Sequence, residues 1–530
     1  MRWVTSLLAP LGVGLVALIA ARSAMLPGLA FWDTGEFQAV APLLGTAHPT
    51  GYPTYVILGW IANAVLAPFG EPAFRMNLFA GLSVAVAAAV TTDLARTLTR
   101  STPLGMLAGL GLALTPEVWA IGTRAEAHAL HLAFVAILLR LLVGWEEAHG
   151  REARGGELGA GPAASGGRPA DRWLVAATVV FALSVGNHSL TLLLALPIGL
   201  YVLAVQPGIL RRPRLILTCL AVLVGTLVAV FLELPLRAGP FRAPLVYGRP
   251  ETWDGFWYIV LAQQFQGSLL DPFGDLAAKT AMLATRAVAQ FGILAALIPA
   301  GLVTAAIIRP RYALLTGSAV ALTLFFNASY VNADIGRYDL GPILIAWTWI
   351  AILGRALIDA VLGPAGVDPL HDTLEPSSRR RGLGPATALA TLALVVLLVP
   401  TALAVPTRHA AVDAREETEA QQWVDQALAA MAPDAVVVSW WSYSTPLWYA
   451  QRVEGRRPDI RIVDDRTRLD EDLGDYDDVI DANLPTHPVY VIRDDPREIE
   501  AIGQRYRIAP VLGPTARYLV RVLGPVEGGS

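Results

Sequence analysis

Long apolar segments alternate with short polar ones along the first 405 residues of this chain. A helix that crosses a bilayer needs roughly 20 apolar residues, and about eleven runs approach that length. They lie near residues 4–24, 76–95, 103–119, 128–145, 173–187, 189–206, 214–235, 287–308, 312–330, 340–360 and 385–405. The pattern predicts an α-helical polytopic membrane protein.

A further apolar run, at residues 52–69, is ambiguous because prolines lie at both ends and Trp60 and Asn63 lie inside it. Cytoplasmic loops are enriched in Lys and Arg. If this run does not cross and the N-terminus is cytoplasmic, every arginine cluster lies inside; if it crosses, all of them move outside. We therefore expect a juxtamembrane helix at 52–69, within a first outer loop at 25–75. The clusters are Arg96 and Arg100, Arg309 and Arg311, and those within residues 151–172, 211–214 and 379–381.

The chain changes character near residue 406. Residues 1–405 form the expected transmembrane domain, interrupted by Gly-, Ala- and Arg-rich cytoplasmic linkers at 146–172 and 362–384 that we expect to be disordered. Residues 406–530 contain short β-branched runs separated by helix-like segments, which predict a small α/β domain on the extracytoplasmic side. These runs are 435–440, 460–465, 489–494 and 518–523.

Two segments are unusually aromatic. The outer loop 236–286 contains Trp253, Phe256, Trp257 and Tyr258, which suit a helix in the headgroup zone. The segment SWWSYSTPLWYA at 439–450 could contact its own domain core, the membrane or a sugar.

Composition agrees with a membrane protein. Hydrophobic residues make up 54% of the chain and charged residues 16%, whereas soluble proteins carry roughly a quarter charged residues. The net charge of −4 is spread along the chain and gives no indication of nucleic-acid binding. The single cysteine, Cys219, excludes disulfides and cysteine-based metal sites. Because Lys279 is the only lysine, we expect a GC-rich bacterial source. Separately, we expect the first apolar run to be a retained span in the inner or plasma membrane.

The predicted topology places polar residues from several hairpins on the outer face. Polar groups near a membrane core are costly, so this convergence indicates a functional site there. Beyond the opening loop, the residues are Glu117, Arg124, Glu126, His128, Asn187, His188, Glu233, Arg237, Asn327, Asn332, Asp334, Arg337, Tyr338 and Asp339.

The opening loop, residues 31–53, holds two carboxylates, Asp33 and Glu36, followed by His48 in a Pro- and Gly-containing turn. A carboxylate within reach of an acceptor hydroxyl can serve as a general base. We favour Asp33 as this catalytic base, with Glu36 as its nearest rival. The competing interpretation is a capping box, with Asp33 as N-cap and Glu36 as its partner three residues later.

The remaining candidates are substrate-binding residues. Arg124, Arg237 and Arg337 could bind phosphate, or could be interfacial arginines paired to nearby acids. His48 could hydrogen-bond Asp33, contact phosphate or fix the turn. His128 and His188 lie at span ends, where a lone histidine is often structural; Tyr52, Glu126 and Tyr338 complete the set. Asp33, Glu36 and His48 match no dedicated metal-ligand spacing, so no metal or other cofactor is expected.

Four motifs resemble the transmembrane-protein-260-like family, whose vertebrate members are protein O-mannosyltransferases. They are FWDTGEFQAVAPLLGTAHPTGYPTYVILG (31–59), TRAEAHAL (123–130), GNHSLTLLLALP (186–197) and LPLRAGP (234–240), and the resemblance covers most of residues 25–350. The family is similar to the GT-C class of membrane glycosyltransferases. The resemblance implies a multi-span fold with an essential acid in the first outer loop. Relatives often show two adjacent acids, whereas here Thr34 and Gly35 separate Asp33 from Glu36.

The resemblance also implies a polyprenyl-phosphate-linked sugar donor and inverting transfer to a hydroxyl. We therefore expect a glycosyltransferase that moves a sugar, with mannose as a candidate, to a protein or glycan acceptor on the extracytoplasmic face. One alternative is a transporter or flippase of polyprenyl-linked glycans, which would need polar residues inside the spans or on both faces. Another is a non-catalytic scaffold for envelope assembly, with the C-terminal domain as its binding module.

Overall fold

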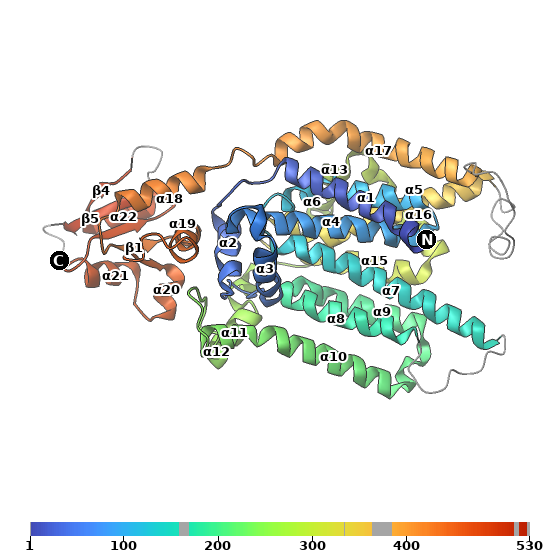
Figure 1. The fold of residues 1–530 in the computed structure, drawn as a ribbon, viewed down its shortest axis with the longest axis horizontal. Helices are drawn as coiled ribbons and strands as arrows, with labels where there is room; N and C mark the ends of the chain where they lie inside the picture. Colours follow the sequence, from blue (N-terminus) through green and yellow to red (C-terminus); the bar gives the residue numbers. More distant parts are fainter. Residues whose placement is uncertain (1, 158–168, 333, 363–383, 513–518, 527–530) are drawn as a thin grey trace.

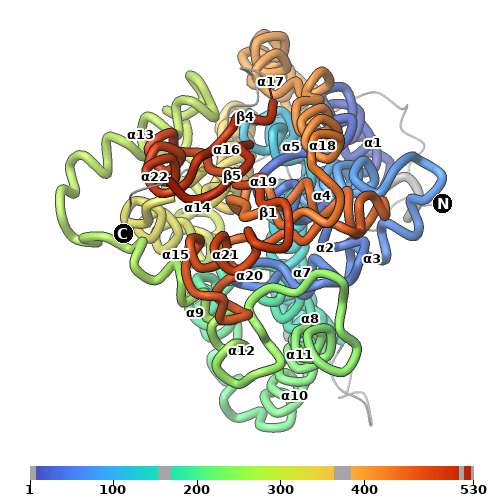
Figure 2. The backbone as a smooth tube through the Cα atoms, turned by 90° about the vertical axis from the view of Figure 1, so that its left-hand side faces the viewer, coloured from blue at the N-terminus to red at the C-terminus, as the bar shows by residue number. Residues whose placement is uncertain are grey.

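A computed structural model describes residues 2–157, 169–332, 334–362, 384–512 and 519–526. A long helical bundle is joined at one end to a smaller domain that contains a β-sheet (Figure 1). The N-terminus lies toward the far end of the bundle, and the C-terminus lies at the outer edge of the small domain. Viewed along the long axis, the small domain lies over the end of the bundle (Figure 2).

Apolar helices pack side by side to form the bundle. Its centre contains α4 (Pro72–Thr99), α5 (Thr102–Ala113), α7 (Ala127–Glu157) and α16 (Leu340–Leu362), and α1 (Arg2–Ser23) packs against α4 and α5 with its other face exposed. Trp145 and Trp347 are fully buried there, and Gly111 lets α5 approach the Trp347 ring closely. The surrounding elements are α6 (Pro116–Ile121), α8 (Asp171–Asn187), η2 (Ser189–Leu194), α9 (Ala195–Val205), η3 (Pro207–Arg211), α10 (Pro213–Phe231), α11 (Glu233–Ala238), α13 (Leu276–Phe291), η5 (Gly292–Ala296), α14 (Leu297–Ile308), α15 (Pro310–Asn327), η6 (Ile335–Asp339) and α17 (Pro385–Val412).

Every predicted span falls on helical structure. Within the described residues, seven helical stretches are long and apolar enough to cross a membrane: Pro72–Thr99, Ala127–Glu152, Pro169–Asn187, Pro213–Ala238, Leu276–Ile308, Ile335–Leu362 and Pro385–Val412. Three more predicted spans coincide with the shorter apolar helices Leu7–Ser23, Thr102–Ala113 and Ser189–Val205. The remaining predicted span, 312–330, coincides with α15. The chain is thus a mainly helical, multi-pass membrane protein; the number of eleven spans stays a prediction.

The segment 52–69 forms α3 (Pro53–Val65) and the short η1 (Ala67–Phe69). The 13 residues of α3 extend about 20 Å at 1.5 Å per residue, which is too short for a hydrocarbon layer of about 30 Å. Together with α2 (Trp32–Leu43), α3 runs across the end of the bundle instead of along it (Figure 1).

The C-terminal domain is built on a five-stranded sheet of order β2-β1-β3-β5-β4. β1 (Val436–Ser439) pairs in parallel with β2 (Arg461–Asp464) and β3 (Val489–Ile492), whereas β5 (Leu519–Pro525) is antiparallel to β3 and β4 (Tyr506–Pro510). The helices are α18 (Glu419–Ala430), α19 (Trp441–Trp448), η9 (Tyr449–Val453), α20 (Asp465–Asp470), α21 (Tyr476–Asn483) and α22 (Pro496–Arg505). The four predicted strands are present. The fifth strand, β4, was not predicted from the sequence, and it pairs with β5.

Two boundaries differ from the sequence-based expectation. Residues 146–157, predicted to be disordered, continue α7, and Glu152 Oε1 accepts a 2.8 Å hydrogen bond from the Ala170 N–H just before α8. The remaining parts of the predicted linkers, 158–168 and 363–383, lie outside the described residues. At the other boundary, α17 continues to Val412, past residue 405. The loop 236–286 contains α12 (Trp253–Val260), where an interfacial helix was expected, followed by η4 (Gln263–Ser268).

Candidate functional site

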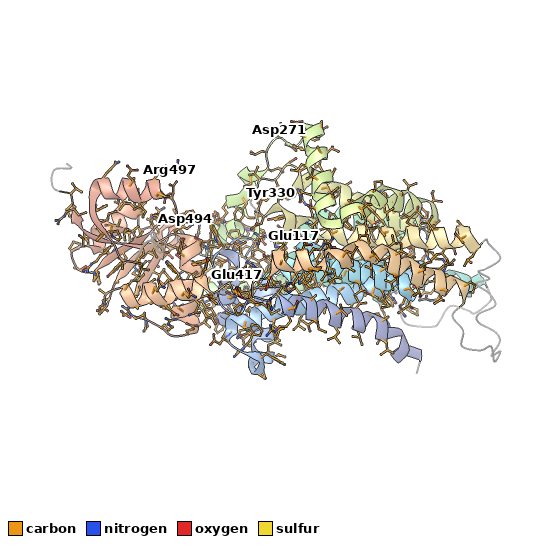
Figure 3. All side chains as sticks on the ribbon, turned by 90° about the horizontal axis from the view of Figure 1, so that it is seen from above. Glu117, Asp271, Tyr330, Glu417, Asp494 and Arg497 are labelled. Carbon is orange, nitrogen blue, oxygen red and sulfur yellow. The ribbon has the colours of Figure 1, made fainter. Side chains whose placement is uncertain are left out.

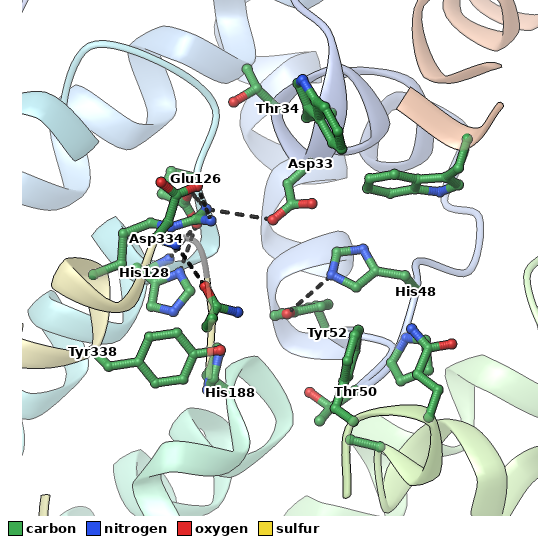
Figure 4. A pocket seen from close by; sticks show the side chains of 18 of the residues that line it. Asp33, Thr34, His48, Thr50, Tyr52, Glu126, His128, His188, Asp334 and Tyr338 are labelled. Carbon is green, nitrogen blue, oxygen red and sulfur yellow. Dashed lines mark hydrogen bonds and ion pairs between the residues drawn. The ribbon is translucent and has the colours of Figure 1, made fainter. Parts of the chain in front are cut away.

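A cavity of about 1340 Å³ lies where the bundle meets the C-terminal domain. Its walls come from the start of α2, the 48–52 turn, the start of α7, the outer loop after Tyr247, the 326–338 segment and the start of the C-terminal domain. Viewed from above, Tyr330 and Glu417 lie near this junction, whereas Asp494 and Arg497 lie within the C-terminal domain (Figure 3). Figure 4 shows Asp33 and His48 on one side of the cavity, with Glu126, His128 and Tyr338 on the other.

Asp33 is the second residue of α2 and lines the cavity. Its side chain is 32% exposed, and Oδ2 lies 3.4 Å from Arg337 Nη1. Phe31 is the N-cap, and no side chain caps this helix. The capping-box interpretation is therefore wrong: α2 begins two residues too early for Asp33 to be the N-cap, and this carboxylate lines the cavity instead.

Glu36 lies one turn further along α2 and is buried behind the cavity wall. Its Oε1 accepts a hydrogen bond from the His48 backbone N–H at 3.0 Å, and its Oε2 pairs with His48 Nδ1. Tyr52 Oη lies 3.3 Å from the other ring nitrogen, Nε2. Burial lowers the pKa of His48, but the Glu36 carboxylate outweighs burial, and the pKa is raised to about 9. His48 is therefore an imidazolium at neutral pH, held in place by Glu36.

Arg337 links three acids at the opposite wall. Its Nη1 donates to Glu126 Oε2 at 2.6 Å, and its Nη2 donates to Asp334 Oδ2 at 2.8 Å, in addition to the longer contact with Asp33. Burial raises the pKa of Glu126, but Arg337 and His128 outweigh it and hold this pKa well below its usual range. Arg337 and Glu126 thus form a buried, permanently charged pair beside Asp33.

A cluster of aromatic rings completes this wall. His128 Nδ1 lies 2.8 Å from a Glu126 oxygen, and the His128 ring lies 4.5 Å from that of His188 and 5.2 Å from that of Tyr338, between centroids. The Tyr52 ring lies 5.7 Å from His188. Burial, reinforced by His128, holds the pKa of His188 well below its ordinary value, so this ring is neutral. His188 Nδ1 accepts the Leu190 N–H at 3.1 Å, so the ring proton is on Nε2.

Two predicted arginines have other partners. Arg124 lines the rim of the cavity, where its Nη2 lies 3.1 Å from Glu417 Oε1. Arg237 does not line the cavity; it donates to the carbonyls of Leu43 and Leu44 at 3.2 and 2.7 Å and so closes the C-terminus of α2. Among the predicted site residues, only Glu36 and Arg237 lie outside the lining. The described residues contain no group of three or more His, Cys, Asp or Glu side chains arranged to hold a metal ion.

A polar network that the sequence did not reveal holds the cavity walls together. Asn77 of α4 is fully buried, and its amide donates to the carbonyls of Leu26 and Gly28 at 3.0 and 3.1 Å. Its Oδ1 accepts from Gln38 Nε2 at 2.9 Å and from the Ala125 N–H at 2.8 Å. Asn77 thereby ties the segment before Asp33 to the segment before Glu126. Asn77 lies in the apolar run predicted as a span at 76–95, and that run indicated only a membrane helix.

The C-terminal domain forms the outer wall of the cavity. Trp440 and Trp441 line it, and the Trp441 ring lies 5.7 Å from His48 and 6.4 Å from the exposed Trp32. Gly35 faces α19 so closely that a Cβ would lie 2.8 Å from Thr445 Oγ1. The aromatic segment therefore has two parts: the two tryptophans face the cavity, and Leu447, Trp448 and Tyr449 pack into the domain core.

Known proteins resemble this chain in sequence and in fold. Residues 33–208 match the family model described as the protein O-mannosyl-transferase TMEM260 N-terminal domain. The chain is 27% identical to mouse protein O-mannosyl-transferase TMEM260 over 451 residues, which are 82% of this chain and 59% of the mouse protein. The chain thus spans less than two thirds of the length of that relative.

Solved structures show the same fold. The structure of ArnT from Cupriavidus metallidurans bound to undecaprenyl phosphate has a TM-score of 0.56 at 15% identity, covering 98% of each chain. The oligosaccharyltransferase of Archaeoglobus fulgidus, tethered with an acceptor peptide, has a TM-score of 0.50 at 13% identity, covering 92% of this chain and 69% of that one. These matches confirm the resemblance inferred from the motifs: residues 33–208 are similar to the TMEM260 N-terminal domain, and the chain has the same fold as the ArnT structure.

Proposed function

We propose that this protein is a membrane glycosyltransferase that transfers a sugar, with mannose as the first candidate, from a polyprenyl-phosphate-linked donor to a hydroxyl acceptor. One observation carries the proposal: the Asp33 carboxylate faces a large cavity that also contains the Arg337 guanidinium and the His48 imidazolium. The mouse relative is named as an O-mannosyltransferase, and one structural neighbour was solved with undecaprenyl phosphate. Both support this substrate class.

In the proposed reaction, the acceptor hydroxyl oxygen attacks the anomeric carbon of the donor while the bond from that carbon to the phosphate oxygen breaks. Asp33 takes the hydroxyl proton, and the polyprenyl phosphate leaves with the bonding electrons. Because attack and departure occur on opposite faces, the anomeric configuration inverts. Asp33 suits the role of base because its carboxylate is partly exposed and, among the described residues, contacts one cation, Arg337, at 3.4 Å.

His48 and Arg337 are the proposed partners of the leaving phosphate. Fixed cations aimed at the atoms where negative charge develops stabilise the transition state most in a site that excludes water. Glu36 would act as a positioning residue, because it is buried and bonded to His48 and therefore does not face the substrate. In this scheme the two acids of the opening loop have different roles.

The remaining expectations belong to the same proposal. The cavity would lie on the extracytoplasmic face of an inner or plasma membrane, with the N-terminus inside, residues 1–405 as the catalytic transmembrane domain and residues 406–530 outside. The arginine distribution supports this orientation. The Arg-rich, Lys-poor composition supports a bacterial envelope as the setting, and the proposed acceptor is a protein or glycan.

The test is transfer from a polyprenyl-phosphate-linked mannose by the purified full chain in lipid nanodiscs. Asp33→Asn keeps the shape of the side chain but removes the base, and should lower transfer by about 10²–10⁴-fold. Asp254→Asn, in the first turn of α12 outside the cavity lining, is the matched control. Transfer by Asp33→Asn at the wild-type rate would remove Asp33 from the mechanism. Vesicle flux of a lipid-linked glycan without transfer would instead favour a flippase, and wild-type function in an Asp33→Ala, Glu36→Ala double variant would favour a scaffold.

A further inference from the structure

The segment from Leu245 to Gln264 forms one wall of the cavity and is attached on two sides. Toward the membrane domain it is bonded to Thr46, two residues before His48. The Thr46 N–H donates to the Leu245 carbonyl at 3.2 Å, and the Tyr247 N–H donates to Thr46 Oγ1 at 2.6 Å. The wall is therefore fixed directly to the turn that carries His48.

The second attachment comes from the C-terminal domain. The Arg466 guanidinium of α20 lies over two rings of this wall, 5.1 Å from the Tyr247 centroid and 4.7 Å from that of Tyr258. Arg466 also pairs with Asp470, and Asp470 Oδ2 accepts the Gly248 N–H at 2.9 Å. A guanidinium over an aromatic face is attracted by the ring quadrupole, and the attraction is stronger when the group is desolvated, as it is here.

This contact reaches the cavity itself. The hydroxyls of Tyr247 and Tyr258 both donate to Gln264 Oε1, at 3.1 and 2.9 Å, and Tyr247 and Gln264 line the cavity. Asp464, buried at the end of β2, fixes the start of α20 by accepting from the Thr467 N–H at 2.7 Å and from its hydroxyl at 2.6 Å. A continuous series of contacts thus joins the sheet of the C-terminal domain to the His48 turn. Figures 1 and 2 both show α20 beside the loop that leads to α12.

We propose that Arg466 and Asp470 form a clasp that holds the 245–264 wall in place, and that the C-terminal domain thereby sets the shape of the substrate cavity. Arg466 does not line the cavity, so it is a positioning residue that acts through Tyr247 and Gln264. The effect on transfer rests on the proposed function, whereas the effect on the wall does not. Loss of the clasp should weaken substrate binding more than it slows the chemical step, because Asp33 and Arg337 are held by other contacts and His48 keeps its two bonds to Glu36.

Hydrogen–deuterium exchange of the full chain in nanodiscs tests the wall directly. Arg466→Ala should increase amide exchange across residues 245–264 by about 5- to 30-fold, the range expected for losing a desolvated cation–π contact. Arg466→Lys keeps the charge but loses the planar stack on the rings. Its amide exchange across residues 245–264 should lie between that of Arg466→Ala and that of the wild type. Arg461→Ala is the matched control, because Arg461 lies on neighbouring β2 and its ion pair within the described structure is with exposed Glu471. Equal exchange in Arg466→Ala and Arg461→Ala would overturn the clasp.

Transfer kinetics give the second readout. Arg466→Ala should raise KM by about 5- to 30-fold with a smaller change in kcat. Tyr258→Leu removes a ring under the Arg466 guanidinium without altering the C-terminal domain, and it should raise KM in the same way. Tyr258 does not line the cavity, so this variant also tests the clasp if Arg466→Ala fails to fold. A fall in kcat alone would overturn the proposed role of the clasp in substrate binding. Absence of mannosyl transfer in the wild type would count against the proposed function, while the exchange experiment would still decide the clasp.

Discussion

Glu36 holds His48 through two bonds, one from each carboxylate oxygen: Oε1 accepts the backbone N–H at 3.0 Å, and Oε2 pairs with ring Nδ1. The carboxylate therefore fixes both the turn and the ring of His48. This arrangement gives the second acid of the opening loop a role that does not require contact with substrate. It also makes the charge of His48 depend on Glu36.

The first prediction concerns pH. Burial lowers the pKa of His48, but Glu36 outweighs it and raises this pKa to about 9, so the imidazolium persists at neutral pH and is lost as pH rises through about 9. Transfer should therefore decline on the alkaline side near pH 9. Glu36→Gln removes the main cause of the upward shift and should move that decline to lower pH by at least about one unit, equivalent to about 1.4 kcal/mol. Transfer rates between pH 5 and 10 measure it.

The raised pKa of His48 should also make the folding stability of the protein fall at alkaline pH. A folded-state pKa above the unfolded value contributes stability that is fully present below the unfolded pKa, ordinarily near 6.5, and is lost as pH rises through about 9. The control is Glu471→Gln, which removes an exposed carboxylate paired with Arg461. If the transfer rate declined at the same alkaline pH in wild type and Glu36→Gln, His48 would not be the titrating group.

The second prediction concerns Arg337. Arg337→Ala leaves the buried Glu126 carboxylate without its main cation, which typically costs about 3–5 kcal/mol. Arg337→Lys restores charge but not the two-pronged contact with Glu126 and Asp334, so we expect intermediate stability and low activity. Thermal unfolding in nanodiscs measures the loss. The control Arg415→Ala removes an exposed pair with Asp413, and its thermal stability should be close to that of the wild type. An equally small loss of stability for Arg337→Ala would contradict the inferred buried network.

The third prediction concerns the contact between α2 and the C-terminal domain. A Cβ at Gly35 would overlap the Ala30 carbonyl and lie 2.8 Å from Thr445 Oγ1, so Gly35→Ala should cost about 1–3 kcal/mol and loosen the domain contact. Gly28→Ala is the matched control, because nothing lies within 4 Å of its Cβ position. Limited proteolysis after α17 reports the contact. Equal protease resistance of the two variants would show that α2 and α19 do not pack as closely as described.

The fourth prediction concerns Asn77. Asn77→Ala leaves the Ala125 N–H and the Leu26 carbonyl without their partner, whereas the Gly28 carbonyl keeps its bond from Gln38 Nε2; each buried unsatisfied group costs about 1–3 kcal/mol. We expect lower stability and weaker transfer, since the segments carrying Asp33 and Glu126 lose their link. Thermal unfolding and transfer by the same preparation measure both effects. Asn483→Ala, in α21 of the C-terminal domain, tests whether a lost amide alone lowers transfer; it should not.

The sequence by itself determined where the helices form and which residues meet at one end of the bundle. Apolar run length is a local property, so runs such as 76–95 and 385–405 predicted helices correctly. The β-branched runs predicted β1, β2, β3 and β5 for the same reason. Because polar groups avoid the membrane core, the sequence predicted one site for the polar ends of several hairpins. The structure places these residues in one cavity: Asp33, His48, Glu126, His188 and Arg337.

The tertiary structure alone decided what each of these side chains does. Asp33 and Glu36 are equivalent in the sequence, yet one faces the cavity and the other is buried against His48. Arg237 and Arg337 were indistinguishable as phosphate partners, yet one closes α2 and the other lies in the cavity. Their surroundings come from segments about 200 to 300 residues away along the chain. The role of a charged group depends on which groups face it across space, and that arrangement exists only once the chain is folded.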